Sequence, residues 1–402
     1  MLPASNSLLW RSDWAIRIAW IARSVEAEGK GELMPRIHNP ANPGAPTSIS
    51  SSWFPARTTA LGTLAKTFFL VMVCAHFAFR YVSNPSFLNL SVYTQGLERT
   101  PYQYRVLPMY VFRVMMRSGL IVRLASHQRF LNDDPHLLIF MGLALVSLIG
   151  AMLVTRLTIS RLTGDSGFAF WAVFMIALMC DLQLASPGAF ILPYDVPSLF
   201  FFATGMYLTI SRRFIGYYLL FPLAVLNRET ACFISVFFVV WEWVRLSKQG
   251  VEIKSRILRL SPHALAQAAI WVAIKIYLAK AYAHNPAEVG STSGGLFVSK
   301  LHYNLHELLK PEQWPYLLSI CGFSLPFLYL QRRWIRCDGI RYACAIVLPI
   351  YFMGMMLVGV IVELRIFTEW LALITPAIAL ILHNRFAPAP HGPGQQGESL
   401  ET

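Results

Sequence analysis

Apolar stretches of membrane-spanning length alternate with short polar loops from Leu61 to Arg385. The stretch Leu137–Leu157 carries no charge before Arg156, and Ile340–Leu364 is a second long apolar stretch. A bilayer core of about 30 Å needs roughly 20 apolar residues in a helix. A helix also satisfies its own backbone N–H and C=O groups, for which lipid offers no partner. The pattern therefore predicts an all-α, polytopic transmembrane helical bundle.

About ten spans are expected, and they lie near 61–82, 137–158, 167–184, 197–211, 214–226, 230–246, 264–283, 315–331, 341–362 and 366–383. The transmembrane domain would thus occupy 60–385. Residues 1–59 are expected to form a cytoplasmic tail, with an amphipathic segment at Leu8–Ile21 and a linker rich in Pro and Ser over 35–56. Residues 386–402 are expected to form a flexible cytoplasmic tail.

Charge refines this picture without changing the class of protein. The chain has 402 residues, of which 55% are hydrophobic and only 14% charged, and its formal net charge is +13. A soluble domain carries about 25% charged residues, so the deficit agrees with lipid exposure. The basic residues lie beside apolar spans, which indicates contact with membrane phospholipids and no nucleic-acid partner. We expect a multi-pass protein of the cell inner membrane.

The basic clusters also predict an orientation. With the N-terminal tail in the cytoplasm, the basic clusters of the loops fall on the cytoplasmic side, as the positive-inside rule requires. Three sizeable extracytoplasmic loops then remain, at 83–136, 185–196 and 284–314. The cytoplasmic clusters are Arg156/Arg161, Arg212/Arg213, Lys248/Lys254/Arg256/Arg259 and Arg332/Arg333/Arg336/Arg341.

Two segments depart from the simple pattern. Residues 106–124 are apolar but contain Arg113, Arg117 and Arg123. Burying these arginines in hydrocarbon would cost at least ~2.5 kcal/mol each near the centre, so this helix is expected to lie along the outer membrane surface. The short spans 214–226 and 230–246 are expected to form a hairpin, with the sequence NRET at its outer tip.

The orientation places many carboxylates and arginines on the outer side. Arginine binds phosphate through two parallel hydrogen bonds without losing its charge, and a carboxylate can orient or deprotonate an attacking hydroxyl. This mixture suits a phosphorylated, polar substrate. The residues are Glu98, Arg99, Arg105, Asp133, Asp134, Asp181, Asp195, Arg228, Glu229, His284, His302, His306, Glu363, Arg365 and Glu369.

Four stretches resemble the GT-C class of membrane glycosyltransferases. They are the first outer loop 83–136, which contains YRVLP, then Leu192–Arg213, Phe214–Trp243 with NRET, and Val362–Leu382. The resemblance implies an integral membrane enzyme that moves a sugar from a polyprenyl-phosphate lipid to an extracytoplasmic glycan, lipid or protein. It implies no nucleotide or other cofactor. A divalent metal is compatible with the class, but the sequence shows no ligand cage, and His302 and His306 lack a third ligand in register.

The resemblance also suggests roles for individual residues. It implies that substrate is bound by Arg99, Arg105, Asp195, Arg228, Glu229, Glu363 and Arg365. The class usually carries its key acid early in the first outer loop, often as an Asp or an acidic pair. This chain differs, because that position offers only Glu98, and the pair Asp133 and Asp134 comes late in the loop. These three residues are the candidate catalytic carboxylates.

Other interpretations remain open for the function of the chain and for the pairs of charged residues within it. The broken helix pair would also suit a transporter or flippase for a lipid-linked or anionic solute. Arg228 and Glu229 are equally compatible with an ion pair that closes the hairpin tip, and Asp195 with a helix N-cap. The pairs Glu98/Arg99 and Glu363/Arg365 are likewise compatible with structural or solvated ion pairs.

Overall fold

Helices form the regular structure of the computed structural model, which describes residues 60–131, 133–186, 189–287 and 299–386. The only β-structure within these residues is two isolated β-bridges. The all-α prediction is therefore confirmed for this part of the chain. The predicted tail 1–59 and residues 387–402 of the other tail lie outside the described residues. The helices are α2 (Ala60–Val82), α3 (Leu90–Gln95), α4 (Val106–Met116), α5 (Gly119–Ala125), α6 (Pro135–Thr163), α7 (Ser166–Ala172), α8 (Phe174–Leu184), α9 (Asp195–Ile210), α10 (Phe214–Asn227), α11 (Cys232–Lys248), α12 (Ile253–Ala281), α13 (Leu301–Leu308), α14 (Trp314–Leu318), α15 (Ser324–Gln331), α16 (Asp338–Val358) and α17 (Trp370–Phe386).

Six helical segments of the described residues are long and apolar enough to cross a membrane. They are α2, α6, α7 with α8, α11 with the preceding 3₁₀ turn, α12 and α16. Predicted spans near 197–211, 214–226 and 366–383 correspond to the shorter helices α9, α10 and α17, of 16, 14 and 17 residues. The helices are therefore compatible with a multi-pass membrane protein, while the number of about ten spans stays a prediction.

The predicted span at 315–331 is wrong as a single helix. The chain forms α14, then a tight turn in which Cys321, Gly322 and Phe323 all have positive φ, and then the eight-residue α15. Gln183 of α8 stabilises this turn, because its Oε1 accepts the backbone N–H of Cys321 at 3.2 Å. An eight-residue helix is only about 12 Å long, too short to cross the hydrocarbon core.

The predicted surface helix at 106–124 is helical but divides into α4 and α5. α4 buries Val106, Met109 and Phe112 against its neighbours, whereas α5 is mostly exposed. Arg113 donates to the carbonyls of Thr94 at 2.6 Å and Gln95 at 2.7 Å, so it caps the end of α3. The position of this pair along a membrane surface stays a prediction.

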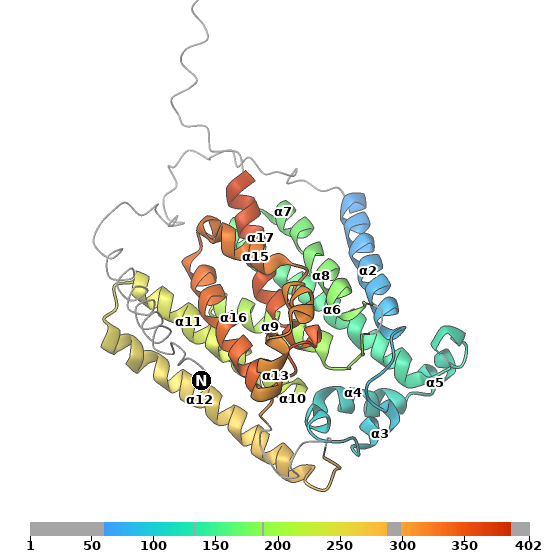
Figure 1. Cartoon of the computed structure of the whole chain (residues 1–402). Coiled ribbons are helices and arrows are strands. Elements are labelled where there is room, and N and C mark those ends of the chain that lie inside the picture. The colour runs from blue at the N-terminus through green and yellow to red at the C-terminus, as the bar shows by residue number, and fades with distance from the viewer. Residues whose placement is uncertain (1–59, 132, 187–188, 288–298, 387–402) are drawn as a thin grey trace, which may run out of the picture. The chain divides into compact units, whose positions relative to one another are not determined.

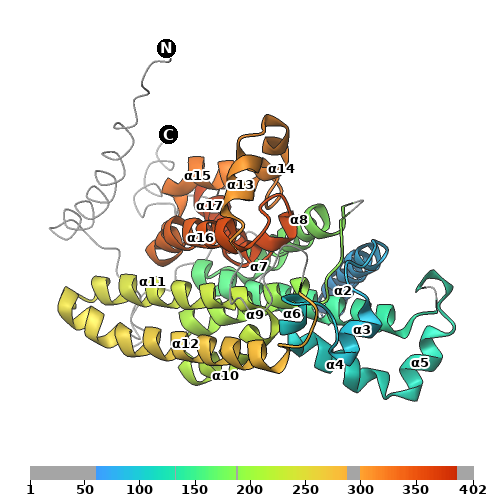
Figure 2. The same ribbon diagram turned by 60° about the horizontal axis from the view of Figure 1, so that its bottom comes forward.

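The most buried helix is α17, whose residues Trp370–Ile381 are all buried. It contacts α6, α8, α9 and α16. By contrast, α2 and α12 bury only 17% of their most apolar window and lie at the edges of the bundle (Figures 1 and 2). Apolar helices with so much exposed surface are typical of lipid-facing spans.

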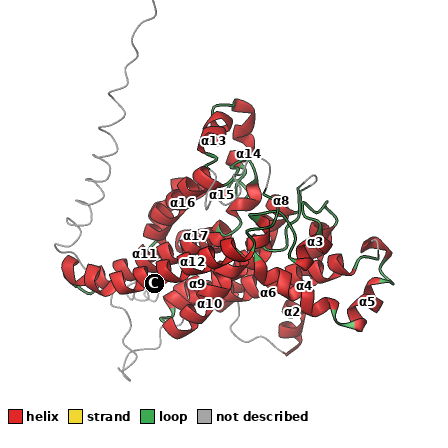
Figure 3. Ribbon diagram, turned by 90° about the horizontal axis from the view of Figure 1, so that it is seen from below, coloured by secondary structure: helices red, strands yellow, loops and turns green. Residues whose placement is uncertain are grey.

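Loops and helix ends that are distant in sequence meet at one end of the bundle, beside α3 and α8 (Figure 3). The Ile191 N–H donates to the Pro85 carbonyl at 3.1 Å, which joins the loops before α3 and α9. Gln183 donates through Nε2 to the Leu364 carbonyl at 2.6 Å, joining α8 to the loop before α17. We call this the loop end. It contains the described parts of all three predicted outer loops and the NRET tip.

Candidate functional site

A buried ion-pair cluster lies at the loop end. Arg228 follows α10, Asp195 begins α9, and Glu369 directly precedes α17. Nη1 of Arg228 lies 3.2 Å from Oδ1 of Asp195 and 3.4 Å from Oε1 of Glu369. All three side chains are at most 3% exposed. The structure therefore gives Arg228 two partners, and neither is its sequence neighbour Glu229.

The local backbone explains why Arg228 leaves the helix. α10 ends at Asn227, whose Nδ2 donates to the Tyr194 carbonyl at 3.1 Å. Arg228 is extended, with φ −160° and ψ 136°, and a 3₁₀ turn, η3 (Glu229–Ala231), follows before α11. The indole N–H of Trp271 in α12 donates to the Glu229 carbonyl at 3.0 Å. The two short helices pair as the hairpin prediction requires, since Tyr217 of α10 packs on Phe238 of α11 with ring centroids 5.0 Å apart, while the place of NRET at an outer tip stays a prediction.

Hydroxyl groups complete the cluster. Thr230 donates to Oε1 of Glu369 at 2.5 Å, and Tyr351 of α16 donates to Oε2 at 2.7 Å. The Tyr81 hydroxyl of α2 lies 3.4 Å from Oδ2 of Asp195. Both oxygens of Glu369 therefore have hydroxyl donors, as buried carboxylates require, whereas Oδ1 of Asp195 has only its ion pair with Arg228 among the described residues. The cluster thus ties five helices together around Arg228 and holds that arginine in one place.

Arg105 lies beside this cluster and is less completely paired. Its Nη2 is 3.5 Å from Oε1 of Glu229, and its guanidinium carbon lies 4.1 Å from the Tyr194 ring centre. Burial alone would lower the pKa of Arg105. The nearby Tyr194 and Glu229 raise it by more than burial lowers it, so the pKa lies above its usual value and the arginine keeps its charge. Among the described residues, neither Nε of Arg105 nor the Tyr194 hydroxyl has a hydrogen-bond partner.

Four arginines and three aromatic rings form a continuous run from the surface into the cluster. Each guanidinium carbon lies within 6 Å of the next ring centre, a distance at which the ring quadrupole attracts the cation. The contacts, which we call the arginine run, are Arg365–Phe87 at 5.9 Å, Phe87–Arg99 at 4.7 Å, Arg99–Tyr102 at 5.3 Å, Tyr102–Arg105 at 5.5 Å, Arg105–Tyr194 at 4.1 Å and Tyr194–Arg228 at 5.8 Å.

Exposure falls from Arg99 towards the cluster. The Arg99 side chain is 35% exposed and its Nε is 3.7 Å from Glu98, whereas Arg105 is 11% and Arg228 is 3% exposed. Arg365, which contacts the same ring as Arg99, bonds to Glu363 at 2.5 Å. The structure therefore brings together the four arginines and five of the acidic residues that the sequence singles out, Glu98, Asp195, Glu229, Glu363 and Glu369, while their roles in binding or catalysis stay predictions.

The candidate catalytic carboxylates have different surroundings. The two oxygens of Glu98 accept the backbone N–H groups of Asn89 at 3.2 Å and Arg99 at 3.1 Å, so this carboxylate closes the loop after α3. Asp133 is exposed, with φ 57°. Asp134 caps α6 by accepting the N–H of His136 at 2.8 Å. Asp134 also lines a cavity between the start of α6 and the loop that precedes α3.

Sequence reasoning missed the aromatic partners and one buried cation. Phe87, Tyr102 and Tyr194 are unremarkable in sequence, because aromatic residues are common at membrane interfaces. Lys275 is buried in α12, with its Nζ 5.2 Å from the Tyr104 ring centre. A lysine within an apolar span was the available signal for it. Glu369 stood among the outer polar residues, but nothing in the sequence paired it with Arg228.

Metal ligands do not gather in the described part of the chain, where no group of three or more His, Cys, Asp or Glu side chains is placed to hold an ion. His302 and His306 lie on α13. Searches with protein-family models, among curated proteins and among solved structures find no match to this chain.

Proposed function

We propose that this protein is an integral membrane glycosyltransferase that moves a sugar from a polyprenyl-phosphate donor to an extracytoplasmic acceptor. The observation that carries the proposal is the arginine run, which places four guanidinium groups at the loop end beside carboxylates. Planar guanidinium groups match the geometry of phosphate oxygens. The exposed apolar surface of α2 is suited to a polyprenyl chain lying in the bilayer.

The four arginines are suited to different tasks. Arg228 is held by two buried carboxylates, so it has a fixed charge but little freedom to take a new ligand. Arg99 is the most exposed of the four and only loosely paired, and Arg105 has one acidic partner, Glu229, at 3.5 Å. We assign the donor phosphate to Arg99 and Arg105, with Arg228 as the buried support behind Tyr194.

The proposed transfer is a substitution at the sugar's anomeric carbon. The acceptor hydroxyl oxygen bonds to that carbon, the bond from the carbon to the phosphate oxygen breaks, and polyprenyl phosphate leaves with the bonding electrons. The hydroxyl proton passes to a carboxylate. By position Glu229 is the candidate acceptor, because its Oε1 lies 3.5 Å from the Arg105 assigned to the phosphate and its side chain is 26% exposed. Arginines at the phosphate would stabilise the charge that develops on the leaving group.

Binding of the donor headgroup is the first test. Full-length protein in nanodiscs is incubated with undecaprenyl phosphate or with undecaprenol, which has the same chain without the charge, and bound lipid is measured by native mass spectrometry. We expect the phosphate to bind at least tenfold more tightly, and R105Q to remove most of that preference. R123Q is the matched control, because Arg123 is an exposed first-loop arginine outside the run.

Transfer is the second test. The same nanodiscs receive undecaprenyl-phosphate-linked radiolabelled hexoses and a membrane extract as the acceptor source, and label in the acceptor fraction is counted. Glu229→Gln should abolish transfer while donor binding remains. Equal binding of the phosphate and the alcohol would overturn the phosphate assignment. Movement of the labelled lipid between leaflets without any transfer would instead support the transporter alternative.

A further inference from the structure

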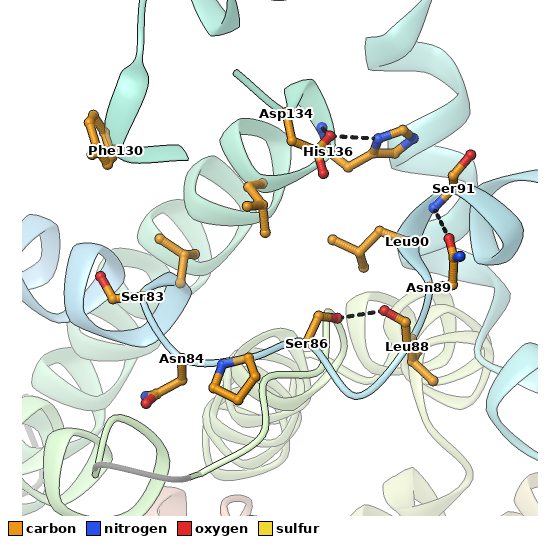
Figure 4. Close-up of a pocket in the computed structure, with 13 residues that line it drawn as sticks. Ser83, Asn84, Ser86, Leu88, Asn89, Leu90, Ser91, Phe130, Asp134 and His136 are labelled. Carbon is orange, nitrogen blue, oxygen red and sulfur yellow. Dashed lines mark hydrogen bonds and ion pairs between the residues drawn. The ribbon is translucent and has the colours of Figure 1, made fainter. Parts of the chain in front are cut away.

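A cavity of about 520 Å³ is lined by the loop that carries Phe87, one of the rings of the arginine run. Its walls come from the loop between α2 and α3 and from the start of α6, with Phe130 at one side (Figure 4). In Figure 4, Asp134 and His136 lie on the opposite side of the cavity from Asn84 and Ser86. Cavities of about 300–1,000 Å³ are the usual size of small-molecule sites.

The polar lining of this cavity differs in charge from the arginine run. Serine and asparagine side chains predominate, and no Lys or Arg is among the lining residues. The charge comes from Asp134, whose Oδ1 accepts from Nδ1 of His136 at 2.9 Å. Such a wall repels anions and offers hydroxyl, amide and carboxylate groups, which suit the hydroxyls of a neutral ligand. The polar lining residues are Ser83, Asn84, Ser86, Asn89, Ser91, Asp134 and His136.

Several of these groups have hydrogen-bonding capacity to spare. Oδ1 of Asn89 accepts the Ser91 and Val92 N–H groups, which leaves its Nδ2 donor without a partner among the described residues. The same holds for the side-chain amide of Asn84 and the second carboxylate oxygen of Asp134 within that part of the chain. A ligand that both donates and accepts hydrogen bonds would satisfy all three.

An aromatic ring completes the complementarity. Phe130 is 50% exposed at the side of the cavity and packs on Phe79 of α2, with ring centroids 5.3 Å apart. Leu88, Leu90 and Pro85 add further apolar lining. A pyranose ring presents hydroxyls around its rim and C–H groups on its faces, so it matches a wall of this mixed kind.

Two lining residues connect the cavity to groups that contact members of the arginine run. Val82 lines the cavity, and its neighbour Tyr81 places its hydroxyl 3.4 Å from Asp195. Asn89 also lines the cavity, and its backbone N–H donates to Glu98, which precedes Arg99. The loop that forms this wall also carries Phe87 of the arginine run, between the lining residues Ser86 and Leu88.

We infer that this cavity binds a neutral saccharide, which is the acceptor of the transfer reaction. Its role as acceptor rests on the proposed function, whereas saccharide binding does not. Asp134, held by the α6 terminus and by His136, would bind acceptor hydroxyls. The arginine run and the cavity would then divide recognition between an anionic donor and a neutral acceptor.

Saturation-transfer difference NMR tests the inference with full-length protein in phosphatidylcholine nanodiscs. The probes are methyl α-glucoside, methyl α-mannoside and methyl α-galactoside, with methyl α-glucuronide as the anionic comparison. We expect a signal from at least one neutral glycoside and at least a fivefold weaker signal from the glucuronide. Asn84→Trp should fill the cavity and remove most of the signal. Asp134→Asn should weaken binding while keeping the helix cap, because Asn also caps helices.

Ser126→Trp is the matched control, because Ser126 is exposed in the same loop and does not line the cavity. Unchanged melting temperatures establish that each variant is folded. The absence of signal from all three neutral glycosides, or an equal signal in folded Asn84→Trp, would overturn the inference. R105Q should lose undecaprenyl phosphate but keep the glycoside signal. A glycoside signal in a protein without transferase activity would therefore defeat the proposed function and leave the saccharide site standing.

Discussion

At the scale of single residues, a buried and a partly exposed arginine of the run should differ in their response to the same substitution. Arg228→Leu leaves the buried carboxylates of Asp195 and Glu369 without their cation, so we expect the free energy of unfolding to fall by about 3–5 kcal/mol. Arg99→Leu removes a partly exposed arginine with one loose partner, and should change stability by no more than about 1 kcal/mol. Unfolding in mixed micelles of increasing SDS content measures both.

The double variant separates charge from packing. Asp195→Asn in the Arg228→Leu background removes one of the two stranded charges, so it should recover part of the lost stability. A stable Arg228→Leu variant, or a double variant that is less stable than the sum of both losses, would show that the cluster is not held by this ion pair.

The sequence indicated which charged residues would matter, but not which of them would pair with one another. Arg228 stood out because a charge at a break between short apolar helices needs a partner. Glu229 was the obvious candidate by proximity, yet the chain after α10 is extended and directs Arg228 to Asp195 and Glu369. That choice depends on how α9, α10 and α17 pack, and apolar periodicity does not encode such packing.

At the scale of elements, close helix contacts depend on glycine. A Cβ at Gly354 of α16 would lie 2.5 Å from Cζ of Phe233 in α11, and one at Gly339 would lie 2.4 Å from the Trp241 ring. Small residues allow membrane helices to approach in this way. Phe233 packs on Tyr351 at 4.3 Å between ring centroids, and Tyr351 bonds to Glu369. A change in how α11 and α16 pack would therefore shift Tyr351, which is hydrogen-bonded to Glu369 of the ion-pair cluster.

Gly354→Ala should overpack this contact and lower the free energy of unfolding by about 1–3 kcal/mol. Gly142→Ala is the matched control in α6, since a Cβ there meets nothing within 4 Å. It should be neutral or stabilising by up to about 1 kcal/mol, because Ala is the better helix former. The same SDS titration reports both, and equal stability of the two variants would argue against a tight α11–α16 contact.

Long apolar helices were predictable, and irregular segments were not. Length and hydrophobicity define α2, α6 and α16 directly. The stretch 315–331 has the same composition, but Cys321 and Phe323 adopt positive φ and a side chain of α8 binds the turn. Composition cannot reveal a turn that a distant glutamine stabilises. The cavity was equally invisible, because its walls come from loops with no apolar period.

At the scale of the whole molecule, the described helix ends sort into two groups. Opposite the loop end, Lys248 of α11 pairs with Asp338 of α16, and Asn384 of α17 donates to the Trp334 carbonyl at 2.9 Å. The basic clusters of the loops that are predicted to be cytoplasmic lie beside these contacts in sequence. The arginine run and the cavity lie at the loop end. Arginines therefore lie at both ends of the bundle, and the orientation stays a prediction from the basic clusters beside the spans, which the positive-inside rule counts.

We expect the loop end to face away from the cytoplasm. Green fluorescent protein fused after Arg213 or Arg336 should fluoresce, because both residues belong to the basic end. Alkaline phosphatase fused after His284, which follows α12 at the loop end, should be active. The exchanged reporters at the same positions serve as controls and should be silent. The reverse pattern would place the arginine run and the cavity in the cytoplasm, where an extracytoplasmic acceptor cannot reach them, and both proposals would then require a cytoplasmic glycan.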